Sequence, residues 1–275
     1  MRLRLRHETN YEYDEPARGA IQVLRLTPRN HATQFVHRWR VEIDADCRLE
    51  RDEDAYGNIT HIFSVDGPIA RMRILVDGEI DLSTNPSGVM RGSLERFPIP
   101  YWTSETPLSA LSPALRAFAE ELWAADGGEP LAYLHRLNST IFENFTFQPG
   151  TTDTATRADE VFERRKGVCQ DFAHVFIAAA RARGIAARYV SGYYLRTDTT
   201  DQEAGHAWAE AHVGGIGWIG FDPAHGLCAD HRYIRLATGR DYLEAAPIRG
   251  ARVGGVGENL SVSVSLQQGR EIKDQ

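Results

Sequence analysis

The stretch Gly167–His174, which reads Gly-Val-Cys-Gln-Asp-Phe-Ala-His, decides the fold because a turn runs directly into an apolar helix. Cys169, Phe172 and Phe176 recur at helical spacing, so the cysteine lies on the side of the helix that packs inward. A cysteine in the first turn of a helix meets unpaired backbone N–H groups and the positive end of the helix dipole. Both stabilise the thiolate, so the sequence predicts a nucleophilic sulfur at Cys169.

Two later segments contain the other groups that a cysteine nucleophile needs. Gly205–Glu210 reads Gly-His-Ala-Trp-Ala-Glu and Trp218–Pro223 reads Trp-Ile-Gly-Phe-Asp-Pro, with a glycine-rich turn between them. A strand hairpin with a three-residue loop would place Asp222 diagonal to His206 on the same face, within reach of its ring. A loop one residue shorter or longer would put the two on opposite faces, and the sequence leaves this register open.

If the two side chains meet, their roles follow from acid–base chemistry. His206 takes the proton of Cys169, while Asp222 holds the other ring N–H and supports the imidazolium charge. The backbone N–H of Cys169, at the start of the helix, donates to the oxyanion of a tetrahedral intermediate. A second oxyanion donor is also required, and the spacing of these motifs does not identify it.

Composition excludes several classes of protein. The 38 acidic and 31 basic residues give a net charge of -7, which argues against a nucleic-acid partner because such binding depends on clustered Lys and Arg. No run approaches the roughly 20 apolar residues of a membrane span, and the charged N-terminus lacks the apolar core of a signal peptide. We therefore expect a cytoplasmic protein without a membrane partner, whose three cysteines are reduced thiols.

Strand and turn signals dominate residues 1–100, whereas residues 101–275 contain helices and further strands. Apolar and charged residues alternate over 39–44, and Asp66-Gly67-Pro68 and Asp77-Gly78 are typical turn sequences. Short strands separated by frequent turns predict a small β-sandwich-like domain in the first region. An exposed strand edge of that domain would suit the pairing of two copies into a homo-oligomer.

The second region predicts an α+β core in which helices precede strands. Ser112-Pro113 is a capping residue followed by proline, and Pro130 begins a second helix with an apolar stripe. Gly184 ends the helix that begins near Cys169. Strands are expected over 187–195, 206–213 and 218–222, and a last one contains Leu260, Val262, Val264 and Leu266.

The motifs, taken in this order, resemble the transglutaminase-like cysteine enzyme superfamily, whose core is similar to the papain fold. The segment Arg183–Tyr193, Arg-Gly-Ile-Ala-Ala-Arg-Tyr-Val-Ser-Gly-Tyr, belongs to the match. The N-terminal half resembles the β-rich region that precedes the core in bacterial members. Gly239–Tyr242, Gly-Arg-Asp-Tyr, resembles their C-terminal segment. The likeness therefore spans nearly the whole chain, and the order of the motifs makes it specific.

The resemblance implies a catalytic Cys169, a base His206 and an orienting Asp222. It implies acyl transfer from an amide, peptide or isopeptide bond through a thioester, with a peptide, protein or small amide as substrate and no cofactor. The acceptor is water in proteolysis or amidolysis and an amine in transamidation. Hydrolysis is slightly preferred, because no motif indicates an amine site or a device that keeps water from the thioester. A non-catalytic binding or assembly module with the same fold is the third interpretation.

One departure from the family pattern concerns the second oxyanion donor. Phe145-Thr-Phe147 stands where a tyrosine is expected ahead of the catalytic segment. If relatives use that hydroxyl near the oxyanion, this chain must use another group there, and Gln148 and Gln170 are candidates. These two glutamines are also candidates for substrate binding. Trp208 is a third candidate, because its side chain would either line the cleft or pack in the core.

Other polar residues near the motifs have simpler interpretations. Asp171 fits a hydrogen-bonding position at the start of the helix. Cys169, Asp171 and His174 match no common zinc spacing, so we expect no metal there. Further histidines are expected at the surface or in local hydrogen bonds; these are His212, His225 and His231.

Overall fold

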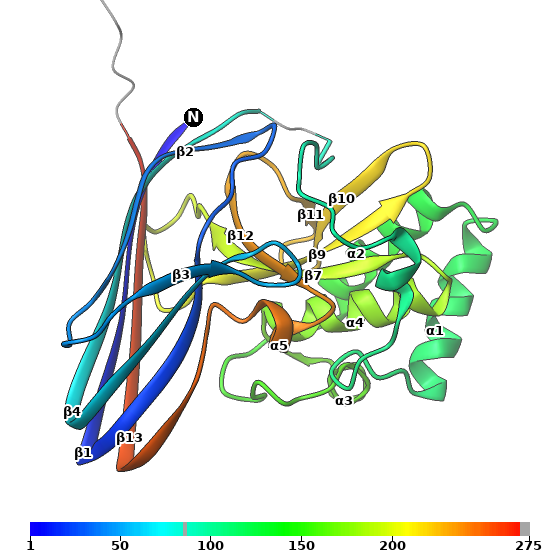
Figure 1. Ribbon diagram of the computed structural model, residues 1–275. Coiled ribbons are helices and arrows are strands. Elements are labelled where there is room, and N and C mark those ends of the chain that lie inside the picture. The colour runs from blue at the N-terminus through cyan, green and yellow to red at the C-terminus, as the bar shows by residue number, and fades with distance from the viewer. Residues whose placement is uncertain (85–86, 270–275) are drawn as a thin grey trace, which may run out of the picture.

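The computed structural model describes residues 1–84 and 87–269, and in them a β-rich unit lies beside a mixed α/β unit (Figure 1). The β-rich unit is a six-stranded antiparallel sheet, and the mixed unit has a five-stranded sheet with helices packed on it. The α+β class predicted from the sequence is confirmed. No helix among the described residues combines the length and apolar character needed to cross a membrane.

Three long strands form the body of the β-rich unit. Each of them bends sharply near its middle, at the lower tip in Figure 1, so that the sheet folds back on itself into two layers. The strands in sheet order are β2 (Gln34–Ile43), β4 (Ile59–Leu82), β1 (Arg2–Thr27), β13 (Ile248–Gln268) and β8 (Asp201–Gln202), with β3 (Glu50–Glu53) paired to β4. The sandwich-like arrangement expected for this region is therefore present, but one bent sheet builds both layers.

The two predicted turns in this region have different outcomes. Asp66-Gly67-Pro68 lies at the bend of β4, where its pairing with β1 is interrupted. Asp77-Gly78 is not a turn, because both residues lie inside β4 and Gly78 pairs with Leu5 and Trp39. A Cβ at Gly78 would collide with the indole of Trp39, so glycine is needed there for a close approach rather than for a reversal.

The five-stranded sheet contains the three strands that the sequence predicted and two that it did not, β11 (Leu227–Cys228) and β12 (Tyr233–Gly239). Its order is β11, β10 (Gly217–Asp222), β9 (His206–Val213), β7 (Ala187–Tyr194) and β12. A short parallel pair, β5 (Thr146–Phe147) and β6 (Lys166–Gly167), lies just before Cys169.

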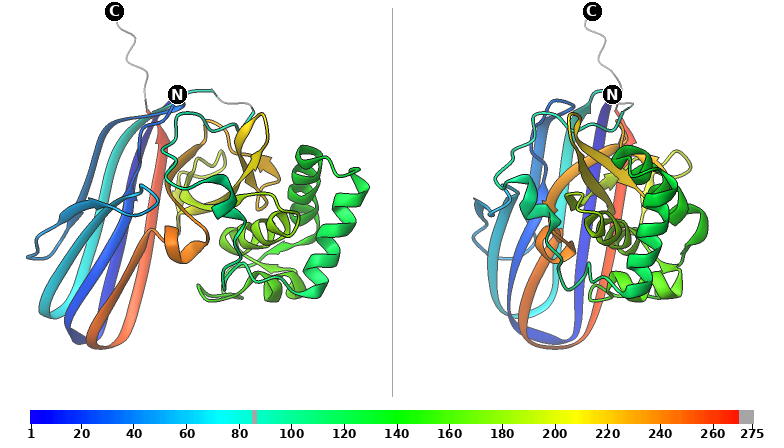
Figure 2. Two further views of the ribbon diagram at one scale, coloured as in Figure 1. Left: turned by 45° about the vertical axis from the view of Figure 1, so that its right-hand side comes forward. Right: turned by 90° about the vertical axis from the view of Figure 1, so that its right-hand side faces the viewer.

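The α-helices lie on one face of this sheet (Figure 2). The Ser112 hydroxyl caps the first of them by accepting a hydrogen bond from the N–H of Leu115. The central helix is buried along nearly its whole length and packs on β9 and β7. The helices are η1 (Ile99–Thr103), α1 (Pro113–Ala125), α2 (Pro130–Asn144), α3 (Ala158–Arg164), α4 (Cys169–Ala182) and α5 (Tyr242–Ala245).

The last strand differs from the expected domain organisation. The sequence grouped it with residues 101–275, but β13 pairs along its length with β1 in the sheet of the β-rich unit. Its alternating pattern fits any half-buried strand, so the pattern alone does not specify a neighbour. The buried apolar core is continuous from one unit to the other.

Two side-chain amides of the β-rich unit attach it to the outer edge of β12. Gln34 is 1% exposed, accepts from the N–H of Arg235 at 2.9 Å and donates to its carbonyl at 3.0 Å. Asn58 binds both backbone groups of Thr238 in the same way, at 2.8 Å each. These amides satisfy backbone groups at the open side of β12, as a neighbouring strand would.

We expect Gln34→Ala to lower the free energy of unfolding by about 1–3 kcal/mol, because buried backbone groups of β12 lose their partner. Urea unfolding measures the loss. Gln267→Ala is the matched control, because Gln267 is an exposed glutamine of the same unit, and its effect should stay within about 0.5 kcal/mol. Equal effects of the two substitutions would show that the Gln34 amide does not secure this edge.

Candidate active site

Cys169 is the first residue of α4, so it occupies the predicted place at a helix N-terminus. The helix start is secured by Asp171, whose carboxylate accepts the N–H of Val168 at 2.7 Å and the hydroxyl of Thr152 at 2.6 Å. Burial is the main cause that raises the pKa of Asp171 above its ordinary value. The structural role expected for Asp171 is thus confirmed, and the residue fixes the turn that presents Cys169.

The hairpin of β9 and β10 has the register on which the site depends. β9 ends at Val213 and β10 begins at Gly217, which leaves a loop of three residues, 214–216. Phe221 pairs with Ala209, so the next residue, Asp222, lies diagonal to His206 on the same face. Nε2 of His206 lies 2.7 Å from Oδ2 of Asp222. The arrangement that the sequence allowed is the one found.

His206 lies between Asp222 and Cys169. Because Asp222 occupies Nε2, Nδ1 is the nitrogen left for the sulfur. The side chain is 8% exposed, and burial alone would disfavour its charged form. The charges of Asp222 and the Cys169 thiolate, with the hydrogen bond to Asp222, outweigh burial and raise the pKa of His206 to about 10. The ring therefore stays protonated well above neutral pH while the thiolate is present.

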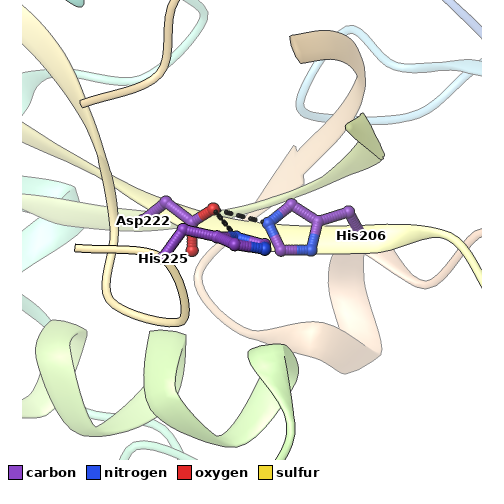
Figure 3. Close-up of side chains that lie close together, drawn as sticks. All are labelled: His206, Asp222 and His225. Atoms are coloured by element: carbon purple, nitrogen blue, oxygen red, sulfur yellow. Dashed lines mark hydrogen bonds and ion pairs between the residues drawn. The ribbon is translucent and has the colours of Figure 1, made fainter. Parts of the chain in front are cut away.

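The Asp222 carboxylate is fully buried and accepts hydrogen bonds on both oxygens, and Figure 3 shows the two from His206 and His225. Oδ2 accepts from Nε2 of His206, from Nδ1 of His225 at 2.8 Å and from the hydroxyl of Tyr233 at 2.8 Å. Oδ1 accepts from the N–H of Ala224 at 2.9 Å. Burial would raise the pKa of Asp222, but the charges and hydrogen bonds of His206 and His225 hold it well below its ordinary value. The group remains a carboxylate, so each ring nitrogen facing it carries a proton.

His225 and Tyr233 are the site residues that sequence reasoning did not assign. His225 was expected at the surface or in a local hydrogen bond, and it does bind Asp222 three residues earlier, yet this contact also brings it into the site. The spacing Asp-Pro-Ala-His was the available signal, because a turn brings such residues together. Tyr233 comes from β12, and nothing near it in the sequence indicates its contact with Asp222.

The three residues predicted to bind substrate lie at different depths. Trp208 is 2% exposed, and its ring lies nearly parallel to that of His206, with 6.2 Å between ring centroids. Gln170 is the half-buried second residue of α4. Gln148 is exposed, and its backbone N–H donates to the carbonyl of Gly167 at 2.8 Å, beside the catalytic turn. Contact of any of them with substrate stays a prediction.

His174 takes no part in a cluster with Cys169. The ring is fully buried, and its Nε2 accepts the backbone N–H of Tyr242 at 3.1 Å. Burial is the main cause that lowers the pKa of His174 to about 3. The ring is thus a neutral residue that anchors the segment before α5.

Family models match both units of the chain. The transglutaminase-like superfamily core matches residues 116–223, which include Cys169, His206 and Asp222. The bacterial transglutaminase-like N-terminal region matches residues 3–81. The chain therefore belongs to the transglutaminase-like superfamily, in the form that carries the bacterial N-terminal region.

Individual relatives agree with this assignment. An uncharacterized protein of Mycobacterium tuberculosis is 34% identical over 276 residues, which cover 90% of this chain and 87% of the relative. The protein-glutamine gamma-glutamyltransferase of Pseudomonas aeruginosa is 30% identical over 162 residues, or 53% of this chain and 24% of that enzyme. A solved structure from Cytophaga hutchinsonii, provisionally described as a cysteine protease, superposes with a TM-score of 0.74. It covers 97% of this chain and 98% of its own at 18% identity, which shows a shared fold.

Proposed function

We propose that this chain is a cysteine acyl-transfer enzyme that cleaves an amide, peptide or isopeptide bond through a thioester on Cys169. The observation that carries the proposal is the position of His206, which binds the buried Asp222 carboxylate through Nε2 and interacts with Cys169. A nucleophile, a base and a group that orients the base are the parts that this chemistry needs. All three lie within the matched superfamily core.

The geometry suggests a sequence of proton transfers. The Cys169 thiolate attacks the carbonyl carbon, and its own backbone N–H at the start of α4 donates to the oxyanion. As the C–N bond breaks, His206 gives its Nδ1 proton to the leaving amine and a thioester forms. The neutral ring then takes a proton from the incoming water or amine, which displaces the sulfur. Asp222 stays ionised throughout and fixes the ring orientation.

Water is the acceptor that we favour. Cys169 is partly exposed to solvent, so water reaches the position of the thioester without a large rearrangement. Hydrolysis needs no second substrate, whereas transamidation needs an amine site that competes with water. Among the described residues, no group of contacting side chains marks out a binding site for an amine.

Transamidation is the second candidate, and one observation favours it. The gamma-glutamyltransferase of Pseudomonas aeruginosa is among the relatives, although this chain spans only 24% of its length. An amine acceptor would enter the same thioester chemistry after the first product leaves. Hydrolysis and transamidation therefore share every step up to the thioester and differ in the molecule that then attacks it.

The first test is the rate at which iodoacetamide alkylates each cysteine near pH 6.5, followed by intact mass and peptide mapping. Burial raises the pKa of Cys47 and Cys228, so these two thiols should be alkylated slowly. They serve as internal references for the rate of Cys169. We expect Cys169 to react at least about tenfold faster than either, and His206→Ala to remove that advantage. Equal rates for all three cysteines, or no effect of His206→Ala, would contradict the proposal.

A second test separates hydrolysis from transamidation. The chain is incubated with a mixture of glutamine-containing and other peptides, with or without a labelled primary amine, and the products are identified by mass spectrometry. We expect free acids as the main products in both conditions, and none with Cys169→Ala. Dominant incorporation of the amine would assign transamidation instead.

A further inference from the structure

A second imidazole shares the carboxylate oxygen that orients the proposed base. Nε2 of His206 and Nδ1 of His225 lie 2.7 and 2.8 Å from Oδ2 of Asp222. One donor atom from each of these three residues lies within 4.8 Å of the other two (Figure 3). The acyl-transfer mechanism uses His206 and Asp222 but gives His225 no step, so its place in the cluster calls for a separate explanation.

Two imidazoles and one carboxylate form a donor set typical of zinc. Zinc bonds to such nitrogen and oxygen atoms are about 2.0–2.2 Å long, so tetrahedral ligand atoms lie about 3.3 Å apart. The hydrogen-bonded distances of 2.7 and 2.8 Å would have to open by about half an ångström, and the two ring nitrogens, which lie within 4.8 Å of each other, would have to settle at about 3.3 Å, through rotations of the three side chains. The required change is therefore local.

The surroundings of the cluster also suit a cation. Asp222 is the acidic member of the cluster, and its carboxylate would bring negative charge to a bound cation. The Tyr233 hydroxyl and the Ala224 N–H hold the carboxylate, as outer hydrogen bonds hold the ligands of metal sites. The His225 side chain is 36% exposed, so an ion can enter from solvent on that side.

We propose that the chain binds a divalent transition-metal ion, best matched by zinc, through His206, Asp222 and His225, and that the ion inhibits acyl transfer. Binding stands on the cluster itself, whereas inhibition rests on the proposed function. An ion on Nε2 of His206 displaces the proton there and leaves the neutral ring with its proton on Nδ1. That nitrogen can no longer accept a proton from Cys169, and Asp222 no longer supports an imidazolium.

A different zinc site would use the sulfur. A thiolate and an imidazole form a common zinc pair, and Cys169 and His206 interact electrostatically. The two sites make opposite demands on the chain. The proposed site needs His225 and not Cys169, whereas the thiolate site needs Cys169 and not His225.

Zinc affinity, measured by competition with a chromophoric chelator, distinguishes these sites. We expect one zinc per chain in the wild type and binding at least as tight in Cys169→Ala, in which no thiolate holds the proton on His206. His225→Asn should lose at least about tenfold in affinity. His231→Asn is the matched control, because His231 is a partly exposed histidine six residues later and outside the cluster, and it should bind as the wild type does.

Cobalt provides a readout that does not depend on the folding of a variant. Cobalt in the proposed site should give visible bands without a near-ultraviolet sulfur-to-metal band. A strong sulfur band, loss of zinc binding in Cys169→Ala, unchanged binding in His225→Asn, or no binding by the wild type would each overturn the proposal.

The inhibition is tested on the alkylation rate of Cys169 with and without zinc. We expect zinc to slow alkylation in the wild type and to have at least about tenfold less effect at the same concentration in His225→Asn. Zinc binding with an unreactive Cys169 would leave the metal site intact and refute the proposed enzyme instead. Zinc binding without slower alkylation would overturn the inhibitory role.

Discussion

The arrangement of the candidate active site depends on one constraint: the Asp222 carboxylate is charged and has no exposed surface. A buried charge of this kind costs several kcal/mol unless its hydrogen-bonding capacity is met. His206 on β9, His225 in the turn after β10 and Tyr233 on β12 all donate to one of its oxygens. The carboxylate therefore holds two strands and a turn in a fixed relation, and this relation orients the ring that faces Cys169.

Strand β12, which contributes Tyr233 to this cluster, also links the two units of the chain. β12 carries Tyr233 at the edge of the five-stranded sheet, and the amides of Gln34 and Asn58 bind the backbone along that edge. The β-rich unit thus supports a strand that contributes directly to the site. The β-rich unit and the transglutaminase-like core also share a continuous buried apolar core.

Sequence reasoning succeeded where the decisive information was local. The helix that begins at Cys169 followed from apolar spacing and the closing Gly184, and the hairpin of β9 and β10 followed from alternation and a glycine-rich turn. It failed where contacts between segments far apart in the sequence determine the structure. The contact of Tyr233 with Asp222, the pairing of β13 with β1 and the close approach that requires Gly78 join residues far apart in the sequence. Alternation indicates a strand but not its neighbour, and a glycine beside an aspartate is equally typical of a turn.

The protonation of the His206 ring, measured by NMR of the chain with nitrogen-15-labelled histidine, tests the account most directly. The ordinary pKa of a histidine is 6.5. Because the pKa of His206 is raised, the folded chain keeps this proton at pH values above 6.5 and releases it only as the pH nears about 10. At about pH 8 both ring nitrogens of His206 should carry protons. His7 and His174 should be neutral there, because burial lowers their pKa to about 4 and about 3. A neutral His206 ring in the unaltered chain at this pH would contradict the account.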